Sequence, residues 1–559
     1  MRVRIVSEKY FSQPSVMTAQ QHFSQVPSAE IERSRFDRSH AYKSTFDAGS
    51  LVPVFVDEVL PGDTFNLSST AFARLATPLK PIMDNMNLDL HFFFVPYRLV
   101  WDNWAYFMGE RKKPSDNPNL LSMPQATISA AVSNASFNGK SLAEYFGIPT
   151  LAKNKALSIS ALPFRAYKLI YNEWYRDQNL IDSLNFSTGD GPDVITASDL
   201  ALLKRGKRHD YFTSCLPWPQ KGDAVRIPLG TSAPVSGNAV GNINVFGTAL
   251  YDGANTLSKG NLEQAGSSGK TLLSSIASGA GSTPESRGLR SSGSNTLALS
   301  SAFADLTNAT AITINELRSA FQIQKLLERD ARGGTRYIEL VLSHFGVRSD
   351  DARLQRPEYL GGGSTPISVN PIASTVSQPT VPQANLAAIG TAVGNAHFSK
   401  SFTEHGLIIG LVSARADLTY QQGIERFWSR KTRYDFYWPA LAHLGEQAVL
   451  NKEIFYSGVP ATDDAAFGYQ ERYAEYRYKP SRITGLFNSD VSASLDVWHL
   501  SQDFTALPVL NQSFIEEQPP VGRIVAVPSE PHFLIDIWFK LLCDRPMPVY
   551  SVPGLIDHF

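Results

Sequence analysis

The chain has 559 residues, with 51 Lys and Arg against 52 Asp and Glu, which gives a formal net charge of −1. Hydrophobic residues make up 43% of it and charged residues 18%, so it can bury a large core, and global disorder is excluded. The near-neutral charge argues against a protein that coats nucleic acid through bulk positive charge alone. Length by itself allows three or four domains, at roughly 150 residues each.

The chain contains two cysteines, Cys215 and Cys543, and neither has metal-binding spacing to other residues. This excludes a disulfide scaffold and a zinc ribbon and suits a reducing compartment, so we expect two buried free thiols. The N-terminus lacks the apolar core of a signal peptide, and no segment approaches the roughly 20 apolar residues that span a bilayer. We therefore expect no membrane insertion.

Residues 1–50 are polar and poorly periodic, with more Lys and Arg than Asp and Glu. Such a segment gains little by folding on itself. We predict an extended N-terminal arm that lies on another surface.

Strand signals begin after this arm. Residues 51–60 are mostly apolar and end at the turn signal Pro61-Gly62-Asp63. In residues 86–94, apolar side chains alternate with polar ones, which predicts a strand with one buried face. Further strands are predicted at 406–414, 523–527 and 533–539.

Two helices are predicted. The first, residues 163–177, begins with a proline and repeats aromatic side chains along one face, which favours packing in a core. The second, residues 313–332, begins with the capping pair Thr313 and Glu316 and ends at two glycines.

Residues 231–300 differ sharply in composition, with 11 Gly and 14 Ser in 70 residues and only seven charged ones. No continuous core can be built from this segment, so we predict a functional insertion. A second, shorter region of this kind runs from 361 to about 395. It opens with Gly361-Gly362-Gly363-Ser364, which could cradle an anion but which we interpret as a flexible loop hinge.

The pattern of many short, proline-punctuated strands, two helices and long inserted loops predicts an all-β-dominated sandwich or jelly roll. We expect a single core with elaborated loops, formed by residues 51–230 and 301–559.

The search for catalytic motifs finds no P-loop, GxSxG, HExxH or GxGxxG after a strand. His397, Glu404 and His405 come nearest to metal-ligand spacing, but adjacent residues 404 and 405 would point to opposite faces of a strand. We expect no catalytic, cofactor-binding or metal site, and hence no enzyme.

Three basic clusters are more informative, and two of them interleave cations with aromatic residues. Such clusters combine phosphate neutralisation with base stacking, as single-strand DNA binding requires. Arg and Tyr are equally typical of protein interfaces, so both a DNA-facing and an inter-subunit role stay open. The clusters comprise Lys204, Arg205, Lys207 and Arg208; Arg426, Trp428, Arg430, Lys431 and Arg433; and Arg472, Tyr476, Arg477 and Lys479.

Several long blocks, in order along the chain, carry a family resemblance: Phe46–Pro53, Phe164–Gln178, Asp210–Gly222, Leu354–Gly362, Arg415–Gly423 and Pro553–Phe559. They resemble the major capsid protein (F type) of microviruses, most closely in its gokushovirus branch. The resemblance runs from the arm to the last residue and is interrupted mainly at 231–300 and 365–395.

The resemblance implies a viral jelly roll, an eight-stranded antiparallel β-sandwich or barrel, that self-assembles into a T=1 icosahedral shell around the circular single-stranded DNA of a small bacteriophage. It also implies a small basic DNA-binding protein as a virion partner, and assembly in the host bacterial cytoplasm. In gokushovirus-like relatives, a long insertion forms threefold surface protrusions proposed to contact a host receptor. Residues 231–300 lie where that insertion is expected.

Two other classes of protein are alternatives to a capsid subunit. A β-sandwich carbohydrate-binding module or hydrolase with inserted loops would need a set of convergent polar residues that the sequence does not display. A host-cell adhesin fits the long insertion but not the scarcity of cysteine or the absence of a secretion signal.

Overall fold

The computed structural model describes residues 31–111, 113, 121–223, 225, 314–376 and 383–550, together with five short strands between 235 and 304. The chain divides into two compact units, one made of residues 1–221 and 327–559 and the other of residues 222–326. In the described part of the chain, no helix combines the length and the apolar character needed to cross a bilayer.

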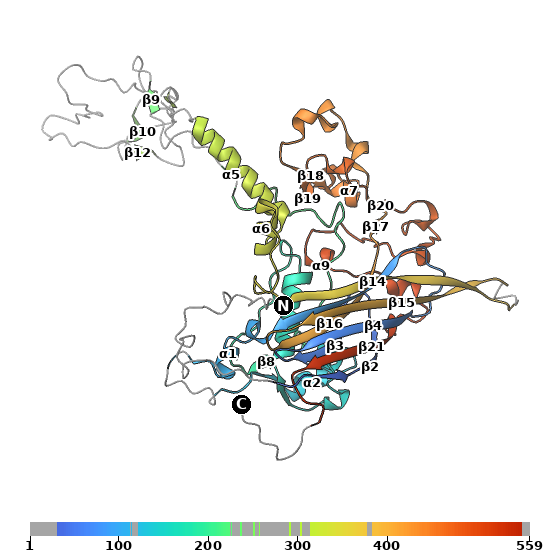
Figure 1. Ribbon diagram of the computed structural model, residues 1–559. Helices are drawn as coiled ribbons and strands as arrows, with labels where there is room; N and C mark the ends of the chain where they lie inside the picture. The colour runs from blue at the N-terminus through green and yellow to red at the C-terminus, as the bar shows by residue number, and fades with distance from the viewer. Residues whose placement is uncertain are drawn as a thin grey trace, which may run out of the picture. The chain divides into compact units, whose positions relative to one another are not determined.

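Nine antiparallel strands form the main sheet of the first unit (Figure 1). They are β1 (Ser34–Asp37), β2 (His40–Phe46), β3 (Val52–Val59), β4 (Thr64–Leu75), β5 (Met86–Pro96), β14 (Glu358–Ala373), β15 (Leu386–Ser401), β16 (Gly406–Ala416) and β21 (Phe533–Arg545). Their order across the sheet is β1–β21–β4–β15–β14–β5–β16–β3, and β2 also pairs with β21.

The sheet curls until its edge strands β2 and β3 approach each other. The Tyr42 hydroxyl donates a hydrogen bond to the Pro53 carbonyl at 3.4 Å, and the ring centroids of His40 and Phe55 lie 5.9 Å apart. The concave face encloses a core rich in phenylalanine, in which Phe55 contacts both Phe92 and Phe539. This confirms the predicted all-β, jelly-roll-like fold.

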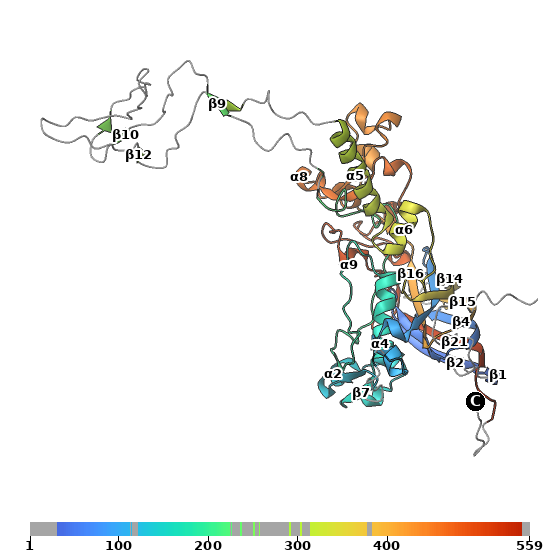
Figure 2. The same cartoon turned by 60° about the vertical axis from the view of Figure 1, so that its left-hand side comes forward.

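A second layer covers the opposite face of β5 and β16. Helix α4 (Leu162–Ile170) continues into the π-helical turn η7 (Tyr171–Tyr175), and Figure 2 shows α4 lying alongside the sheet. Phe164, Tyr167 and Ile170 pack against Phe93 and Ile409 in this layer. The helix predicted at 163–177 and its aromatic core face are therefore confirmed.

The remaining elements of the first unit are short, apart from the paired helices α5 and α6. The sequence did not predict α6 or the short helices. The other α-helices and strands are α1 (Trp104–Phe107), β6 (Gln125–Ile128), α2 (Ala130–Ser136), α3 (Leu142–Tyr145), β7 (Leu157–Ser160), β8 (Asp193–Ile195), α5 (Ile314–Gly333), α6 (Tyr337–Phe345), β17 (Thr419–Tyr420), β18 (Glu446–Leu450), α7 (Asn451–Ile454), α8 (Pro460–Asp463), β19 (Ala466–Glu471), β20 (Ser481–Arg482), α9 (Gln512–Ile515) and α10 (Val521–Ile524).

Helix α5 matches the second predicted helix, although its expected cap, Thr313, lies outside the described residues. It begins within residues 222–326 and ends in the first unit. Besides the start of α5, the described elements of the second unit are the short strands β9 (Val235–Gly237), β10 (Leu250–Tyr251), β11 (Thr256–Leu257), β12 (Arg290–Ser291) and β13 (Ala302–Ala304). Most of the predicted insertion 231–300 lies outside the described residues.

Four predicted strands are confirmed, at 51–60, 86–94, 406–414 and 533–539. The strand predicted at 523–527 is wrong, because residues 521–524 form helix α10. Val521, Ile524 and Val525 are all buried, and their spacing of three and four residues is that of a helix face rather than of a strand.

The loop predicted at 361–395, with its hinge at Gly361-Gly362-Gly363-Ser364, is also wrong, because β14 and β15 occupy most of it. The glycines serve close approach between strands rather than flexibility. A Cβ atom on Gly362 would lie 2.4 Å from the Leu90 carbonyl oxygen, and one on Gly363 would lie 2.5 Å from that of Asn395.

The N-terminal segment is partly in the main sheet. Residues 34–46 form β1 and β2 and pair with β21 of the same chain, while residues 1–30 of the predicted arm lie outside the described residues. The two thiols, Cys215 and Cys543, are buried and free, as expected.

Candidate nucleic-acid interface

The first basic cluster, residues 204–208, lies between two other segments of the chain. The Arg205 N–H donates to the Gly49 carbonyl at 2.8 Å, and the Lys207 N–H donates to the Ile515 carbonyl at 2.8 Å. The Arg205 carbonyl in turn accepts from the Glu517 N–H at 2.7 Å. The backbone of the cluster is therefore fixed on both sides.

Arg205 reaches into the sheet and contacts Asp89 of β5, with Nη1 2.6 Å from a carboxylate oxygen. Arg415 of β16 contacts the same carboxylate at 3.0 Å, although Asp89 is only 1% exposed. Burial opposes ionisation of Asp89, but hydrogen bonding from Ser364 and the charges of the two arginines outweigh it and lower the pKa of this carboxyl. The prediction that β5 has a single buried face is therefore wrong at Asp89, where an ion pair replaces solvent.

Lys207 is also internal, at 6% exposed. Its Nζ donates to the Gln502 Oε1 at 2.8 Å and lies 4.4 Å from the centre of the Phe514 ring. Burial lowers the pKa of Lys207 to about 8, and the nearby buried Glu517 partly opposes that shift. The Lys207 amine therefore makes its contacts inside the subunit rather than at its surface.

The outer members of the first cluster also have partners within the chain. Lys204 Nζ donates to the Ser50 hydroxyl at 3.0 Å, and Arg208 pairs with Asp417 at 3.1 Å.

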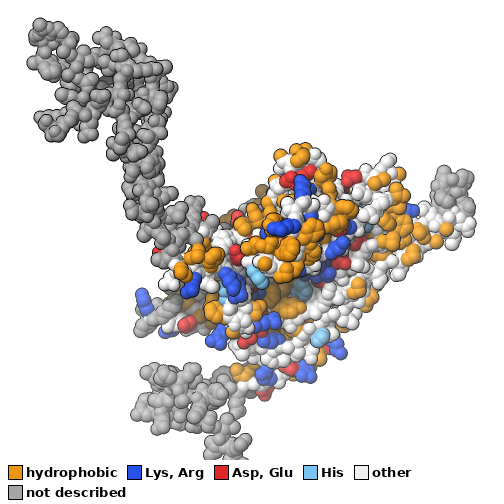
Figure 3. Space-filling view, turned by 90° about the horizontal axis from the view of Figure 1, so that it is seen from above, with side chains coloured by type: hydrophobic (Ala, Val, Ile, Leu, Met, Phe, Trp, Pro, Cys, Tyr) orange, Lys and Arg blue, Asp and Glu red, His pale blue; other side chains and the backbone are white. Residues whose placement is uncertain are grey.

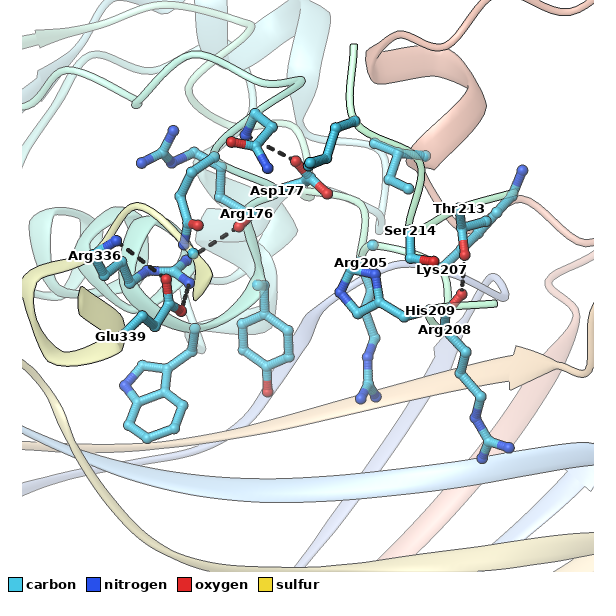
Figure 4. A pocket seen from close by; sticks show the side chains of 18 of the residues that line it. Arg176, Asp177, Arg205, Lys207, Arg208, His209, Thr213, Ser214, Arg336 and Glu339 are labelled. Carbon is cyan, nitrogen blue, oxygen red and sulfur yellow. Dashed lines mark hydrogen bonds and ion pairs between the residues drawn. The ribbon is translucent and has the colours of Figure 1, made fainter. Parts of the chain in front are cut away.

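The cluster lines one side of a cavity of about 1020 Å³. Figure 4 shows Arg205, Lys207 and Arg208 on one side of it, with Arg176 and Arg336 on the other. Arg336 pairs with Glu339 at 3.0 Å, so this cation too is compensated within the subunit. The sequence did not single out Arg176, Arg336 or Arg415, because their spacing along the chain gives no signal.

The second and third clusters form one continuous surface, which we name the aromatic–basic surface and define as residues 425–438 and 472–482. Strands β18 and β19 pair Glu446 with Glu471, and the Arg472 N–H donates to the Gly445 carbonyl at 3.2 Å. This ladder brings the two segments side by side, and with them all nine candidate residues between Arg426 and Lys479.

Eight large aromatic side chains of this surface reach solvent, each with 45% to 71% of its area exposed. They are Phe427, Trp428, Tyr434, Phe436, Tyr437, Trp438, Tyr476 and Tyr478. Figure 3, seen from above, shows hydrophobic side chains gathered with Lys and Arg on one face. The aromatic run 434–438 directly follows Arg433 in the sequence, and it supplies four of the six exposed aromatic members that the prediction left out; the other two are Phe427 and Tyr478.

Arginines of this surface stack on its aromatic rings. The Arg430 guanidinium lies 4.4 Å from the centre of the Tyr476 ring and 5.3 Å from that of Phe436. Arg433 lies 4.7 Å from the Tyr434 ring in the same way. Stacking orders both long side chains; Arg433 stays exposed, whereas the Arg430 side chain is largely buried.

The inner edge of the surface is anchored by Glu453. Arg426 donates to it at 2.8 Å, and the Tyr211 hydroxyl donates to its second oxygen at 2.8 Å. Burial raises the pKa of this carboxyl, and Arg426 opposes the increase. Tyr211 follows the first cluster in sequence, so the two basic regions meet through buried side chains.

A curled antiparallel sheet with long ordered loops and an exposed aromatic surface defines a jelly-roll subunit of the capsid class. Comparison with known proteins identifies the family. A family described as capsid protein (F protein) matches residues 24–555. The chain is 49% identical to capsid protein VP1 of Bdellovibrio phage phiMH2K, over 97% of this chain and 98% of the relative.

Two further relatives carry the same name. Capsid protein VP1 of Chlamydia phage 1 is 46% identical, over 97% of this chain and 98% of the relative. Capsid protein VP1 of Spiroplasma virus 4 is 37% identical, over 97% and 99%. The chain therefore belongs to the F-protein family of phage capsid proteins and is a major capsid protein of the microvirus type. The resemblance stated from the sequence is confirmed.

Proposed function

We propose that this capsid protein builds a T=1 icosahedral shell around the circular single-stranded DNA of a small bacteriophage, and that its role is structural rather than catalytic. Family membership implies a multi-copy shell and a place in the virion. Assembly in the host bacterial cytoplasm and a small basic DNA-binding virion protein are further parts of the proposal.

The aromatic–basic surface is the observation that supports contact between the subunit and the packaged DNA. Its two segments contain eight Lys and Arg against three Asp and Glu. Eight aromatic side chains are exposed on it, and a contiguous exposed apolar patch on a subunit marks an interaction site. Base stacking contributes roughly 1–3 kcal/mol per base, and the excess of cations neutralises phosphates.

The same surface could instead contact a neighbouring subunit, because Trp, Tyr and Arg are enriched at interface hot spots. Its charge favours DNA. Two copies meeting through this surface would bring like charges together, which disfavours association. We therefore assign it to the genome side of the shell.

A charge-removal variant tests this assignment. Lys431→Gln and Arg433→Gln together, both at exposed positions, should leave particle yield unchanged and reduce the DNA packaged per particle. Lys43→Gln, at an exposed pair with Asp536 on the main sheet, is the matched control. Sedimentation measures assembly, and the ratio of absorbance at 260 and 280 nm measures DNA. Normal DNA content in defective shells would assign the surface to a subunit interface.

We also propose that the 231–300 insertion forms a threefold surface protrusion that contacts a host receptor. Its Gly- and Ser-rich composition suits an exposed loop rather than a core. The separation of residues 222–326 into their own compact unit supports the proposal.

A further inference from the structure

We propose that the aromatic–basic surface contains a pocket that binds one nucleobase of single-stranded DNA, with the adjoining phosphate at its rim. This inference rests on the proposed DNA-binding role of the surface and adds a specific site to it. Three features of the pocket carry it: its size, its aromatic lining and its charge.

The pocket has a volume of about 210 Å³. Pockets for drug-sized ligands occupy roughly 300–1,000 Å³, so this one suits a single planar ring rather than a folded peptide or an oligosaccharide. A nucleobase of single-stranded DNA is such a ring, and it is available because no complementary strand holds it.

Aromatic side chains line the pocket at two depths. Tyr211, Phe212 and Tyr420 are almost completely buried and belong to a hydrophobic cluster that also contains Phe467 and Phe514. Phe427, Tyr476 and Tyr478 line it nearer the surface, and about half of each side chain is exposed. A base entering between the exposed rings would stack on them, whatever its identity.

The charged residues of the pocket select an anionic ligand. Four cations line it, against three carboxylates: Arg426, Arg430, Lys479 and Arg482, against Glu425, Glu453 and Glu475. Each carboxylate is already paired, since Arg426 contacts Glu453 at 2.8 Å, Arg430 contacts Glu475 at 3.5 Å and Arg482 contacts Glu425 at 3.2 Å.

This pairing disfavours a Lys or Arg side chain of a partner protein as the occupant, because such a side chain would have to displace an existing ion pair. At the rim, the exposed Lys479 lies 3.4 Å from Glu425, which Arg482 also contacts at 3.2 Å. One carboxylate thus faces two cations, so a phosphate would meet a net positive charge there. The Nε of Arg430 is buried and makes no hydrogen bond to any residue that the structure describes.

The test measures what a single base contributes to binding. The Kd of the purified full-length chain is measured for two oligonucleotides of six nucleotides each. One is entirely abasic, and the other is abasic except for a single central thymine. For the unmodified chain, we expect the thymine to lower Kd about tenfold, within the range that base stacking provides. Tyr478→Ala should abolish most of this gain. Trp428→Ala, on the same surface but outside the pocket lining, should keep it.

The outcomes separate this inference from the proposed function. If both oligonucleotides bind the unmodified chain equally well, DNA contacts the surface but the base pocket is overturned. The pocket is equally overturned if the thymine gain survives in Tyr478→Ala and in a second variant, Phe427→Ala. If neither oligonucleotide nor hexathymidylate binds, the DNA-facing assignment of the whole surface fails, and with it the pocket. Thermal unfolding of each variant shows that it folds.

Discussion

The carboxylate of Asp89 lies 2.6 Å from the guanidinium of Arg205, which follows it by 116 residues in the sequence. Through this contact, the loop that carries the first basic cluster is attached to the middle of the main sheet. Arg205 was a candidate for contact with DNA, but in the folded subunit its charge is used to compensate a buried acid.

Asp89→Asn should destabilise the subunit strongly. The substitution leaves Arg205 and Arg415 without their shared counter-charge in a buried setting, and removing one partner from such a network costs about 3–5 kcal/mol. Urea unfolding of the purified chain measures the change. Asp536→Asn, at the exposed Lys43 pair, should change the free energy of unfolding by less than about 1 kcal/mol and serves as the control.

The stability of the subunit should fall as the pH is lowered from about 6.5 to about 4, and His91 should contribute to that fall. Burial, and then the charge of Arg205, lower the pKa of His91 to about 4. In this window the unfolded chain binds a proton at His91 that the folded chain does not, so the free energy of unfolding rises with pH. The contribution is on the order of 2–3 kcal/mol.

Replacement of His91 by Gln should reduce the slope of stability against pH between those values. His443→Gln, at an exposed histidine, should leave it unchanged. Urea unfolding at several pH values gives the slope. An identical slope in His91→Gln and the unmodified chain would contradict the assignment.

Gly363→Ala should destabilise the subunit by about 1–3 kcal/mol, the usual cost of overpacking. The added methyl would meet the backbone carbonyl of Asn395 on the neighbouring strand β15, which can give way only by separating the strands. Ser368→Ala, at an exposed position of the same strand, is the control. Thermal unfolding decides the matter, because a flexible hinge at Gly363 would tolerate alanine without loss.

The thiols of Cys215 and Cys543 should resist modification in the folded chain. Both are buried, and burial raises the pKa of each, so little thiolate is present near neutral pH. A chromogenic disulfide reagent should label neither thiol within minutes in native buffer. In denaturant, it should label both thiols immediately. Rapid labelling of either thiol in the folded chain would contradict its burial.

The sequence predicted the fold where large apolar side chains alternate. Residues 86–94 predict a strand for that reason and residues 406–414 because they are a nearly continuous apolar run, whereas the small residues of β15 predict a loop. Its alternation does exist, but it is carried by small residues such as Ala388, Ala392 and Ala396, which are buried on one face. A pattern built from alanine and glycine resembles a flexible segment unless the neighbouring strands are known.

The candidate site, like the fold, could be predicted from the sequence only in part. The clusters at 426–433 and 472–479 were recognisable because cations and aromatic rings alternate locally, and they do form one surface. The cluster at 204–208 is visible as a run of cations, but Arg205 pairs with Asp89, Arg208 pairs with Asp417, and Lys207 lies near the buried Glu517. All three carboxylates lie far away in the sequence. Only the fold reveals those partners.

The 231–300 insertion should be dispensable for folding of the first unit and for assembly. Strands β9 and β13 pair Gly237 with Ala302, which brings the two ends of the insertion together. Residues 238–301 can therefore be replaced by an Asn-Gly turn, which suits a two-residue hairpin. In the first unit, the Lys221 N–H and the Leu327 carbonyl lie 3.3 Å apart, so no gap has to be bridged there.

Particles of this deletion variant should sediment like those of the unmodified chain, and their attachment to host cells, measured by co-sedimentation, should be lost. The matched control carries residues 238–301 in reversed order, which keeps the length and composition but not the sequence. It should assemble and also fail to attach, because recognition by a receptor depends on specific side chains. Failure of the deletion variant to fold or assemble would instead show that the insertion is a structural part of the shell, and normal attachment of either variant would remove the insertion from host recognition.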